Sequence, residues 1–137
     1  ADTPLLQLSL PSDYSPGEIY ALGQALAALR HRGVLIMASG VLVHNLGTVD
    51  FRQRHPVPDW AEQFDQWCSR CLENEDHQAL MDFRRASPRF QQAHPTPEHY
   101  TPILVAAGAA GVDHAPVSFP VTGFEYGTLS RRCVQFG

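Results

Sequence analysis

The chain has 137 residues, 44% of them apolar, which is enough to bury one core of ordinary domain size. Its formal net charge is −4, and its ten lysine-plus-arginine residues, all of them arginine, form no cluster, which excludes the electrostatic footprint of a protein that binds nucleic acid or an anionic membrane surface. No apolar run approaches the roughly 18 residues of a membrane span, and residues 1–10 lack the charged start of a signal peptide, so we expect neither.

The first helix has clear start and stop signals. Ser15 is a good N-cap, Pro16 suits the first helical position, and apolar residues then recur at helical spacing until Gly33. Before this helix, residues 4–10 form a partly alternating apolar run with a proline at its edge, which is typical of a strand. A strand in this place is typical of the middle of a larger sheet.

A second strand is expected immediately after the helix. Residues 34–38 are a short apolar run that predicts a buried strand, and Ser39 with Gly40 indicates a tight turn. Strand, helix and strand make a βαβ unit, whose strands should be parallel with a right-handed crossover. Open α/β sheets place their chemistry outside the carboxyl ends of strands. His44, just beyond this strand, is therefore a better site candidate than a histidine on a helix flank.

The middle of the chain predicts a loop and two helices. Residues 47–58 contain prolines and several charges, so we expect a loop that lies over the site. A second helix begins near Asp59 and carries aromatic residues and two cysteines on one side, with charged residues, Asp65 among them, on the other. A third, shorter helix covers residues 76–85.

The last part of the chain predicts one helix and two strands. Thr96 is a good N-cap and Pro97 suits the first helical position, so His99 falls in the first turn of a helix. The rest of that helix is small and apolar, and we expect it to be buried. Residues 117–122 are expected to form a strand, and residues 123–137 a turn followed by a long strand, and the two strands to pair antiparallel at the edge of a mixed sheet.

Together these elements predict the fold class. We expect an α/β fold with a three-layer type of mixed sheet and flanking helices, forming an incomplete half of a larger single domain. The three cysteines fit a reducing compartment better than a disulfide framework, so we expect a cytoplasmic location.

Two local motifs suggest other functions. Cys68-x-x-Cys71 lacks the second pair of a zinc site, and it lies inside a predicted helix, whereas a redox motif follows a strand. We interpret both cysteines as small core residues. The serine of Ser39-Gly40 lacks the glycines that a nucleophile elbow has two residues before and after it, so an α/β serine hydrolase that uses Ser39 remains only an alternative.

Position divides the seven histidines into two groups. His44 and His99 would project from a strand end and a helix start, where α/β folds build sites. Two histidines do not make a metal site, however, because a catalytic metal normally needs three protein ligands. The other five lie in predicted helix ends, loops or polar stretches and are interpreted as solvated surface residues: His31, His55, His77, His94 and His114.

Three segments resemble one known family. They are residues 38–46 (ASGVLVHNL), residues 95–100 (PTPEHY), and residues 123–130 (GFEYGTLS) together with the terminal residues 134–137 (VQFG). These segments resemble the C-terminal half of the DOPA-dioxygenase-like class III extradiol ring-cleavage dioxygenases, whose superfamily also contains the catalytic subunit of protocatechuate 4,5-dioxygenase. The resemblance covers essentially the whole chain, and three motifs in register are far more specific than one.

The resemblance implies a mononuclear non-haem iron(II) site, sometimes found holding zinc(II), that binds a catechol and O2. It implies that His99 is a metal ligand and that His44 sits against the metal as the acid/base for the substrate hydroxyl proton. Neutral imidazoles suit a divalent metal with open positions, and a histidine that titrates near neutrality can take and return a proton. Some relatives use a glutamate ligand, and Glu98 adjoins His99. Consecutive helical residues diverge by about 100°, so only one can face the metal, and the DOPA-type pattern favours His99.

The sequence also departs from the family pattern. The family's other two ligands are histidines near the start of a chain about twice this long, in His-Gly-Ser-Pro and Asp-His-Gly motifs, and neither motif is present. We therefore expect residues 1–137 to be the C-terminal part of a catalytic domain whose N-terminal half is absent, and to be inactive alone. The expected partners are a small catechol, O2 and that missing half. A metal-free ligand-binding or interaction domain of the same fold is the non-enzymatic alternative.

Overall fold

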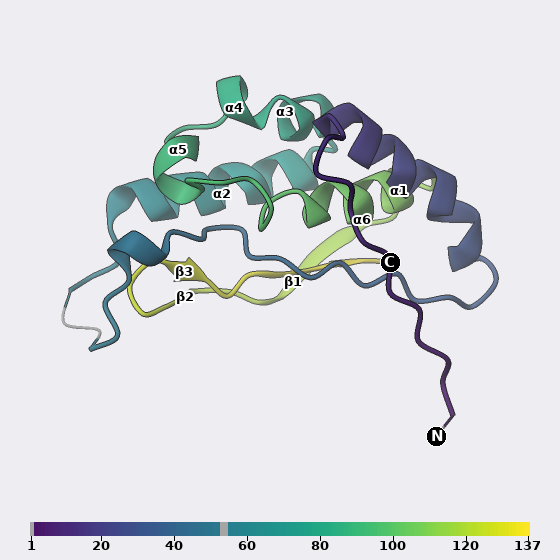
Figure 1. Cartoon of the computed structure of the whole chain (residues 1–137), viewed down its shortest axis with the longest axis horizontal. Coiled ribbons are helices and arrows are strands. Elements are labelled where there is room, and N and C mark those ends of the chain that lie inside the picture. The colour runs from purple at the N-terminus through teal and green to yellow at the C-terminus, as the bar shows by residue number, and fades with distance from the viewer. Residues whose placement is uncertain (1, 53–54) are drawn as a thin grey trace.

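The structure is a computed structural model that describes residues 2–52 and 55–137. Figure 1 shows a layer of helices over a layer of extended segments and short strands, in agreement with the predicted α/β class. None of the helices in the described ranges is long and apolar enough to cross a membrane. The helical elements are α1 (Pro16–Arg30), η1 (Leu46–Thr48), α2 (Asp59–Glu73), α3 (His77–Met81), α4 (Phe83–Ala86), α5 (Phe90–Ala93) and α6 (Pro102–Gly111). The strands are β1 (Val117–Val121), β2 (Phe124–Glu125), β3 (Leu129–Ser130) and β4 (Cys133–Phe136).

Helix α1 begins as its local sequence predicts. The Ser15 hydroxyl accepts a hydrogen bond from the Glu18 backbone N–H at 3.3 Å, and the Glu18 carboxylate accepts one from the Ser15 N–H at 2.7 Å. This capping box satisfies two backbone donors that the helix leaves free, and such a cap contributes about 1 kcal/mol. After the helix, Gly33 has a φ of +74°, the left-handed conformation that favours glycine, and the chain turns away. The predicted first helix is confirmed.

Helices α1 and α6 touch backbone to backbone, because each presents a glycine to the other. A Cβ on Gly23 would lie 2.2 Å from the carbonyl oxygen of Val105, and a Cβ on Gly108 would lie 2.2 Å from that of Tyr20. Helix α6 is buried along most of its length, as its small apolar residues predict. The two helices therefore form one close-packed unit. His99 lies three residues before the start of α6.

We expect Gly108→Ala to lower the free energy of unfolding by about 1–3 kcal/mol or more, because the added methyl meets backbone atoms that cannot rotate away. Gly17→Ala is the matched control, since Gly17 lies in α1 and a methyl group added there would have no atom within 4 Å apart from its chain neighbours and the backbone of its own helix. Its stability should be equal or higher by up to about 1 kcal/mol. Urea unfolding of both variants checks this. Equal stability of Gly108→Ala and the unchanged chain would contradict the close contact.

The C-terminal strands pair antiparallel, as predicted, but not as one long strand. β1 pairs with β4 and β2 with β3. The single long strand expected after a turn within residues 123–137 is wrong, because Tyr126 and Gly127 have φ of +50° and +81° and close a hairpin turn between β2 and β3. The backbone of this turn is tied to the loop before α2, since the Asp50 N–H donates to the Tyr126 carbonyl at 2.9 Å.

The two strands predicted at residues 4–10 and 34–38 are not formed among the described residues, and so the parallel βαβ pairing is wrong for this chain. Both segments are extended, and Leu6 is 95% exposed and Leu35 81% exposed. An extended segment becomes a strand only when a neighbouring strand accepts and donates its backbone hydrogen bonds. Within residues 2–52 and 55–137, no backbone hydrogen bond joins residues 35–40 to another segment. The tight turn at Ser39-Gly40 is also wrong, since the chain bends later, at residues 42–43.

The middle helices follow the prediction only in part. α2 begins at Asp59 as expected. The helix predicted over residues 76–85 is two helices, α3 and α4, because the backbone of Asp82 leaves the helical conformation, with φ −89° and ψ +27°. The Asp82 carboxylate accepts a hydrogen bond from the Arg85 side chain. α5 has no counterpart in the prediction, since a helix of four residues carries no readable period.

The helix that follows His99 starts later than predicted. The Thr96 hydroxyl donates to the Glu98 carboxylate at 2.7 Å rather than capping a helix, and α6 begins at Pro102. A proline has no N–H to donate to the residue four positions earlier, so it interrupts a helix started at Pro97 but suits the first position of a new one. His99 therefore lies in the turn just before α6, not in its first helical turn.

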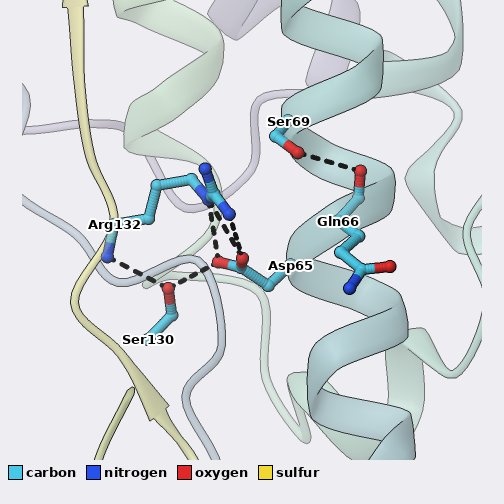
Figure 2. A network of polar contacts seen from close by, with 5 residues as sticks. All are labelled: Asp65, Gln66, Ser69, Ser130 and Arg132. Carbon is cyan, nitrogen blue, oxygen red and sulfur yellow. Dashed lines mark hydrogen bonds and ion pairs between the residues drawn. The ribbon is translucent and has the colours of Figure 1, made fainter. Parts of the chain in front are cut away.

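A buried ion pair ties the C-terminal strands to α2 (Figure 2). Asp65, predicted on the polar side of α2, is buried, and its carboxylate accepts hydrogen bonds from the Arg132 guanidinium and, at 2.6 Å, from the Ser130 hydroxyl. Arg132 also lies over the ring of Phe119, 4.7 Å from its centre. Ser130 in turn donates its N–H to the Val43 carbonyl at 3.2 Å. The network therefore connects α2 to the segment that carries His44.

Candidate functional site

The structure brings together the two histidines that the sequence singles out. His44 follows a bend at residues 42–43, and His99 lies in the turn before α6. Their imidazole rings stack, with centroids 3.7 Å apart and planes inclined by 27°. Both side chains are partly exposed, with 41% of the His99 side chain open to solvent. A pair of adjacent, accessible imidazoles can bind a cation or exchange a proton with a bound molecule.

The backbone before His44 is fixed against the backbone of His99. The Val41 N–H donates to the His99 carbonyl oxygen at 3.0 Å. A Cβ on Gly40 would lie 2.4 Å from the same oxygen, so this position needs glycine for close approach rather than for a turn. The stacking of the two imidazoles therefore follows from a close backbone contact and not only from side-chain rotamers.

Burial and neighbouring charges shift the pKa of His44. Partial burial is the main cause that lowers the pKa of His44, the neighbouring His99 lowers it further, and the Glu98 carboxylate opposes both. The pKa of Glu98 is itself lowered, first by the hydrogen bond from the Thr96 hydroxyl. The Glu98 carboxylate lies 4.0 Å from Nε2 of His99. The Glu98 carboxylate is therefore held by the hydrogen bond from the Thr96 hydroxyl.

His94 is the histidine for which the surface prediction is clearly wrong. It is 1% exposed and lies among Phe64, Phe90 and Tyr100. Burial lowers the pKa of His94 to about 4, so its ring is neutral at physiological pH. Nε2 lies 2.8 Å from the Leu42 carbonyl oxygen, while Nδ1 finds no partner among the described residues.

Three of the four remaining histidines are exposed surface residues. His31, His55 and His114 are exposed, as predicted. His77 is an exception, since it is half-buried and its Nδ1 lies 2.8 Å from the Tyr20 hydroxyl. None of these four stacks on the pair formed by His44 and His99 within the described ranges.

The residues present fit part of a metal site rather than a whole one. His99 offers an imidazole on a partly exposed side chain, a donor that suits iron(II) or zinc(II). Across residues 2–52 and 55–137, however, no group of three histidine, cysteine, aspartate or glutamate side chains is placed to hold a metal ion. A catalytic metal of this kind normally takes three protein ligands. The described residues therefore match at most part of such a ligand set.

A large open groove lies beside the pair. Its volume is about 770 Å³, and it is lined by residues 34–38, by the apolar face of α6 and by β4, with His99 among its lining residues. Leu35 and Met37 on its wall are each 81% exposed. Such an apolar, uncovered wall next to candidate site residues is typical of a surface that another polypeptide or ligand covers.

The two alternative motifs find no support in the structure. Cys68 and Cys71 are both buried in α2, and burial raises the pKa of both thiols, to about 11 for Cys71. They pack as core residues, as interpreted from the sequence. Ser39 is exposed, and no hydrogen bond among the described residues joins it to a histidine base.

The predicted loop over the site is only partly described. Residues 53 and 54, within the loop expected at 47–58, lie outside the described residues. The part that precedes them contains η1, capped by the Asn45 side chain, which accepts from the Gly47 N–H at 3.0 Å. Asn45 directly follows His44, so η1 and its cap fix the backbone immediately after His44.

The sequence is similar to a group of ring-opening enzymes. Residues 3–137 match the family described as the catalytic LigB subunit of aromatic ring-opening dioxygenase. The 4,5-DOPA dioxygenase extradiol of Beta vulgaris is 41% identical over 112 residues, which are 81% of this chain and 41% of that protein. The protein of the same name from Escherichia coli is 36% identical over 141 residues, which cover 100% of this chain and 51% of that protein.

The fold is similar to that of a solved protein. A crystal structure of an uncharacterized protein from Escherichia coli has a TM-score of 0.82 and 34% sequence identity, and the match covers 94% of this chain and 53% of that one. This similarity confirms the predicted α/β fold. The chain spans about half the length of the curated relatives it matches.

Proposed function

Since this chain belongs to the family of the catalytic LigB subunit of aromatic ring-opening dioxygenases, as its three sequence motifs indicate, we propose that it forms part of the active site of an extradiol dioxygenase. The complete enzyme opens the ring of a catecholic substrate with O2 beside the two hydroxyl groups. The observation that carries the proposal is the stack of His44 on His99, whose ring centroids are 3.7 Å apart. Both residues lie within the motifs that resemble the family.

The two histidines have different roles in this proposal. His99 is a metal ligand, supported by its exposure and by its place just before the rigid helix α6. His44 is the acid/base that takes the proton of a substrate hydroxyl and returns it later. If its imidazole turns toward the metal, His44 is also a further contact to that metal. Iron(II) is the metal expected, with zinc(II) able to bind the same donors, and when bound it would supply Lewis acidity and a place for catechol and O2.

Other ligands come from a polypeptide that this chain does not contain. We assign residues 1–137 to the C-terminal part of one catalytic domain, completed by the half of the family's polypeptide that lies outside the match. Two extended segments support this assignment. Residues 4–10 and 34–38 both carry exposed apolar side chains, and residues 34–38 line the groove beside His99. Alone, the 137 residues are expected to be inactive.

The test is ring cleavage by the complete protein. The coding sequence before this segment is read, the whole protein is produced with iron(II), and O2 uptake and ring opening are followed with a panel of catechols, 3,4-dihydroxyphenylalanine among them. We expect O2 consumption that depends on the catechol. A complete protein that binds a catechol without metal, or that binds metal without consuming O2 with any catechol, would instead support a ligand-binding domain of the same fold.

A further inference from the structure

The segment that carries His44 is held by a second segment as well as by His99. This second segment is the end of α5 and the residue after it, residues 92–94. Its contacts are separate from the hydrogen bond between Val41 and His99. Three hydrogen bonds join the two segments: His44 N–H to the Ala93 carbonyl at 2.9 Å, the Asn45 side-chain amide to the Gln92 carbonyl at 2.7 Å, and Nε2 of His94 to the Leu42 carbonyl at 2.8 Å.

The His94 contact fixes the proton on that ring. A backbone carbonyl oxygen can only accept, so Nε2 of His94 must carry the hydrogen. Nδ1 is then a bare acceptor, buried and without a partner among the described residues. The His94 side chain therefore makes a good hydrogen bond to the bend before His44, but it also buries an unpaired Nδ1, which lowers the stability of the fold.

Packing alone would favour a different residue at this position. The ring of His94 lies 5.4 Å from that of Phe64 and 5.6 Å from those of Phe90 and Tyr100, centre to centre. A phenylalanine would fill the same aromatic cluster without an unpaired nitrogen. What phenylalanine lacks is the donor to Leu42. The choice of histidine is therefore explained by that one bond.

We propose that His94 is a positioning residue: by donating from Nε2 to the Leu42 carbonyl it fixes the bend at residues 42–43 and so holds the imidazole of His44 against that of His99. The ring contacts of His94 among the described residues are with Phe64, Phe90 and Tyr100 and not with either ring of the pair. The consequence for catalysis rests on the proposed function, whereas the consequence for the stack of His44 on His99 does not.

The first test examines the stack directly, in the 137-residue chain without metal. Nitrogen-15 NMR of labelled histidine should show His94 protonated on Nε2 and bare on Nδ1 at neutral pH, and the His44 ring protons should be shifted by the ring current of His99. In His94→Phe we expect this ring-current shift to decrease, and in His94→Gln, whose amide can donate to the Leu42 carbonyl, to be largely retained. A proton on Nδ1 of His94, or an unchanged His44 shift in His94→Phe, would overturn the proposal.

The second test uses turnover by the complete protein. We expect His94→Phe to lower kcat by about 10–100-fold with bound metal and KM little changed, and His94→Gln to recover most of the rate, since outer partners of site residues typically have effects of this size. Phe90→Leu is the matched control, because it disturbs the same aromatic cluster but not the bond to Leu42, and it should lower stability with kcat retained. Equal kcat losses in His94→Phe and Phe90→Leu would reduce His94 to a packing role and overturn the proposal.

Failure of the two proposals can be told apart. If the complete protein opens no catechol ring but the His44 shift decreases in His94→Phe, the positioning role stands and the dioxygenase function fails. If ring opening occurs but His94→Phe keeps both the shift and kcat, the function stands and the positioning role fails. Should His94→Phe not fold, the protonation site of His94 in the unchanged chain decides, since the proposal requires the Nε2–H form.

Discussion

Replacing His99 by alanine in the complete protein is expected to remove the metal and, with it, ring cleavage. Loss of a residue that merely orients a ligand lowers metal affinity or activity by about 10–100-fold, so loss of a ligand should exceed about 100-fold. Metal content after gel filtration and the rate of O2 uptake measure both effects. His114→Ala is the control, because His114 is an exposed histidine whose Nδ1 pairs with the Glu75 carboxylate and not with either ring of the pair, and it should keep metal and rate. A His99→Ala protein that retains its full metal content would contradict the assignment of this ligand.

The neighbouring histidine should respond differently. We expect His44→Ala to keep the metal and to lower kcat by about 10²–10⁴-fold, the range for loss of a positioned acid/base. The pair of variants therefore separates metal binding by one ring from proton transfer by the other, although the two rings are in contact. If His44→Ala also lost the metal, His44 would be a ligand and the acid/base would be another group.

The largest expected effect on stability comes from the buried ion pair of Asp65 and Arg132. Only 5% of the Asp65 side chain and 13% of the Arg132 side chain are exposed. Asp65→Ala leaves the guanidinium buried without its carboxylate, so we expect the free energy of unfolding to fall by about 3–5 kcal/mol, a large part of the roughly 5–15 kcal/mol of an ordinary domain. Chemical denaturation of the purified chain measures this change.

Two controls make the interpretation specific. Asp82→Ala breaks the ion pair with Arg85, whose side chain is 83% exposed, and it should have little effect because solvent screens such a pair. Asp65→Ala combined with Arg132→Met removes both charges, and it should be more stable than Asp65→Ala alone. If the single and double variants were equally unstable, loss of packing or of the Ser130 contact, and not the unpaired charge, would be the cause.

The elements that could be predicted are those whose signals are local. Ser15 and Glu18 are three residues apart and form the capping box on their own, so the start of α1 follows from four residues of sequence. The start of α2 at Asp59 is similar. Where two local signals compete, as Pro97 and Pro102 do, the sequence does not decide which proline begins the helix, and the later one does so here.

The elements that could not be predicted depend on distant partners. Residues 34–38 have the composition of a buried strand, but a strand needs a neighbour, and the described residues provide none beside it. Asp65 looks like a surface residue of an amphipathic helix because its partner, Arg132, is far away in the sequence. The sequence on either side of His94 is typical of a loop, and only the aromatic cluster around its ring explains its burial.

The candidate site was partly predictable. Position and the family resemblance select His44 and His99, and the structure places their rings in contact. Their separate roles stay predictions, as do the metal and the catechol. The hydrogen bonds that hold the segment of His44, at Val41 and at residues 92–94, could not be predicted, because backbone contacts between segments leave no pattern in the side-chain sequence.

The most direct measurement is the metal content of the 137-residue chain by itself, compared with that of the complete protein after equal loading with iron(II). Because the described residues offer one accessible ligand and its neighbour but no group of three, we expect far less than one bound ion per chain alone and close to one in the complete protein. Stoichiometric iron and turnover of a catechol by the isolated chain would contradict the claim that it holds only part of the site.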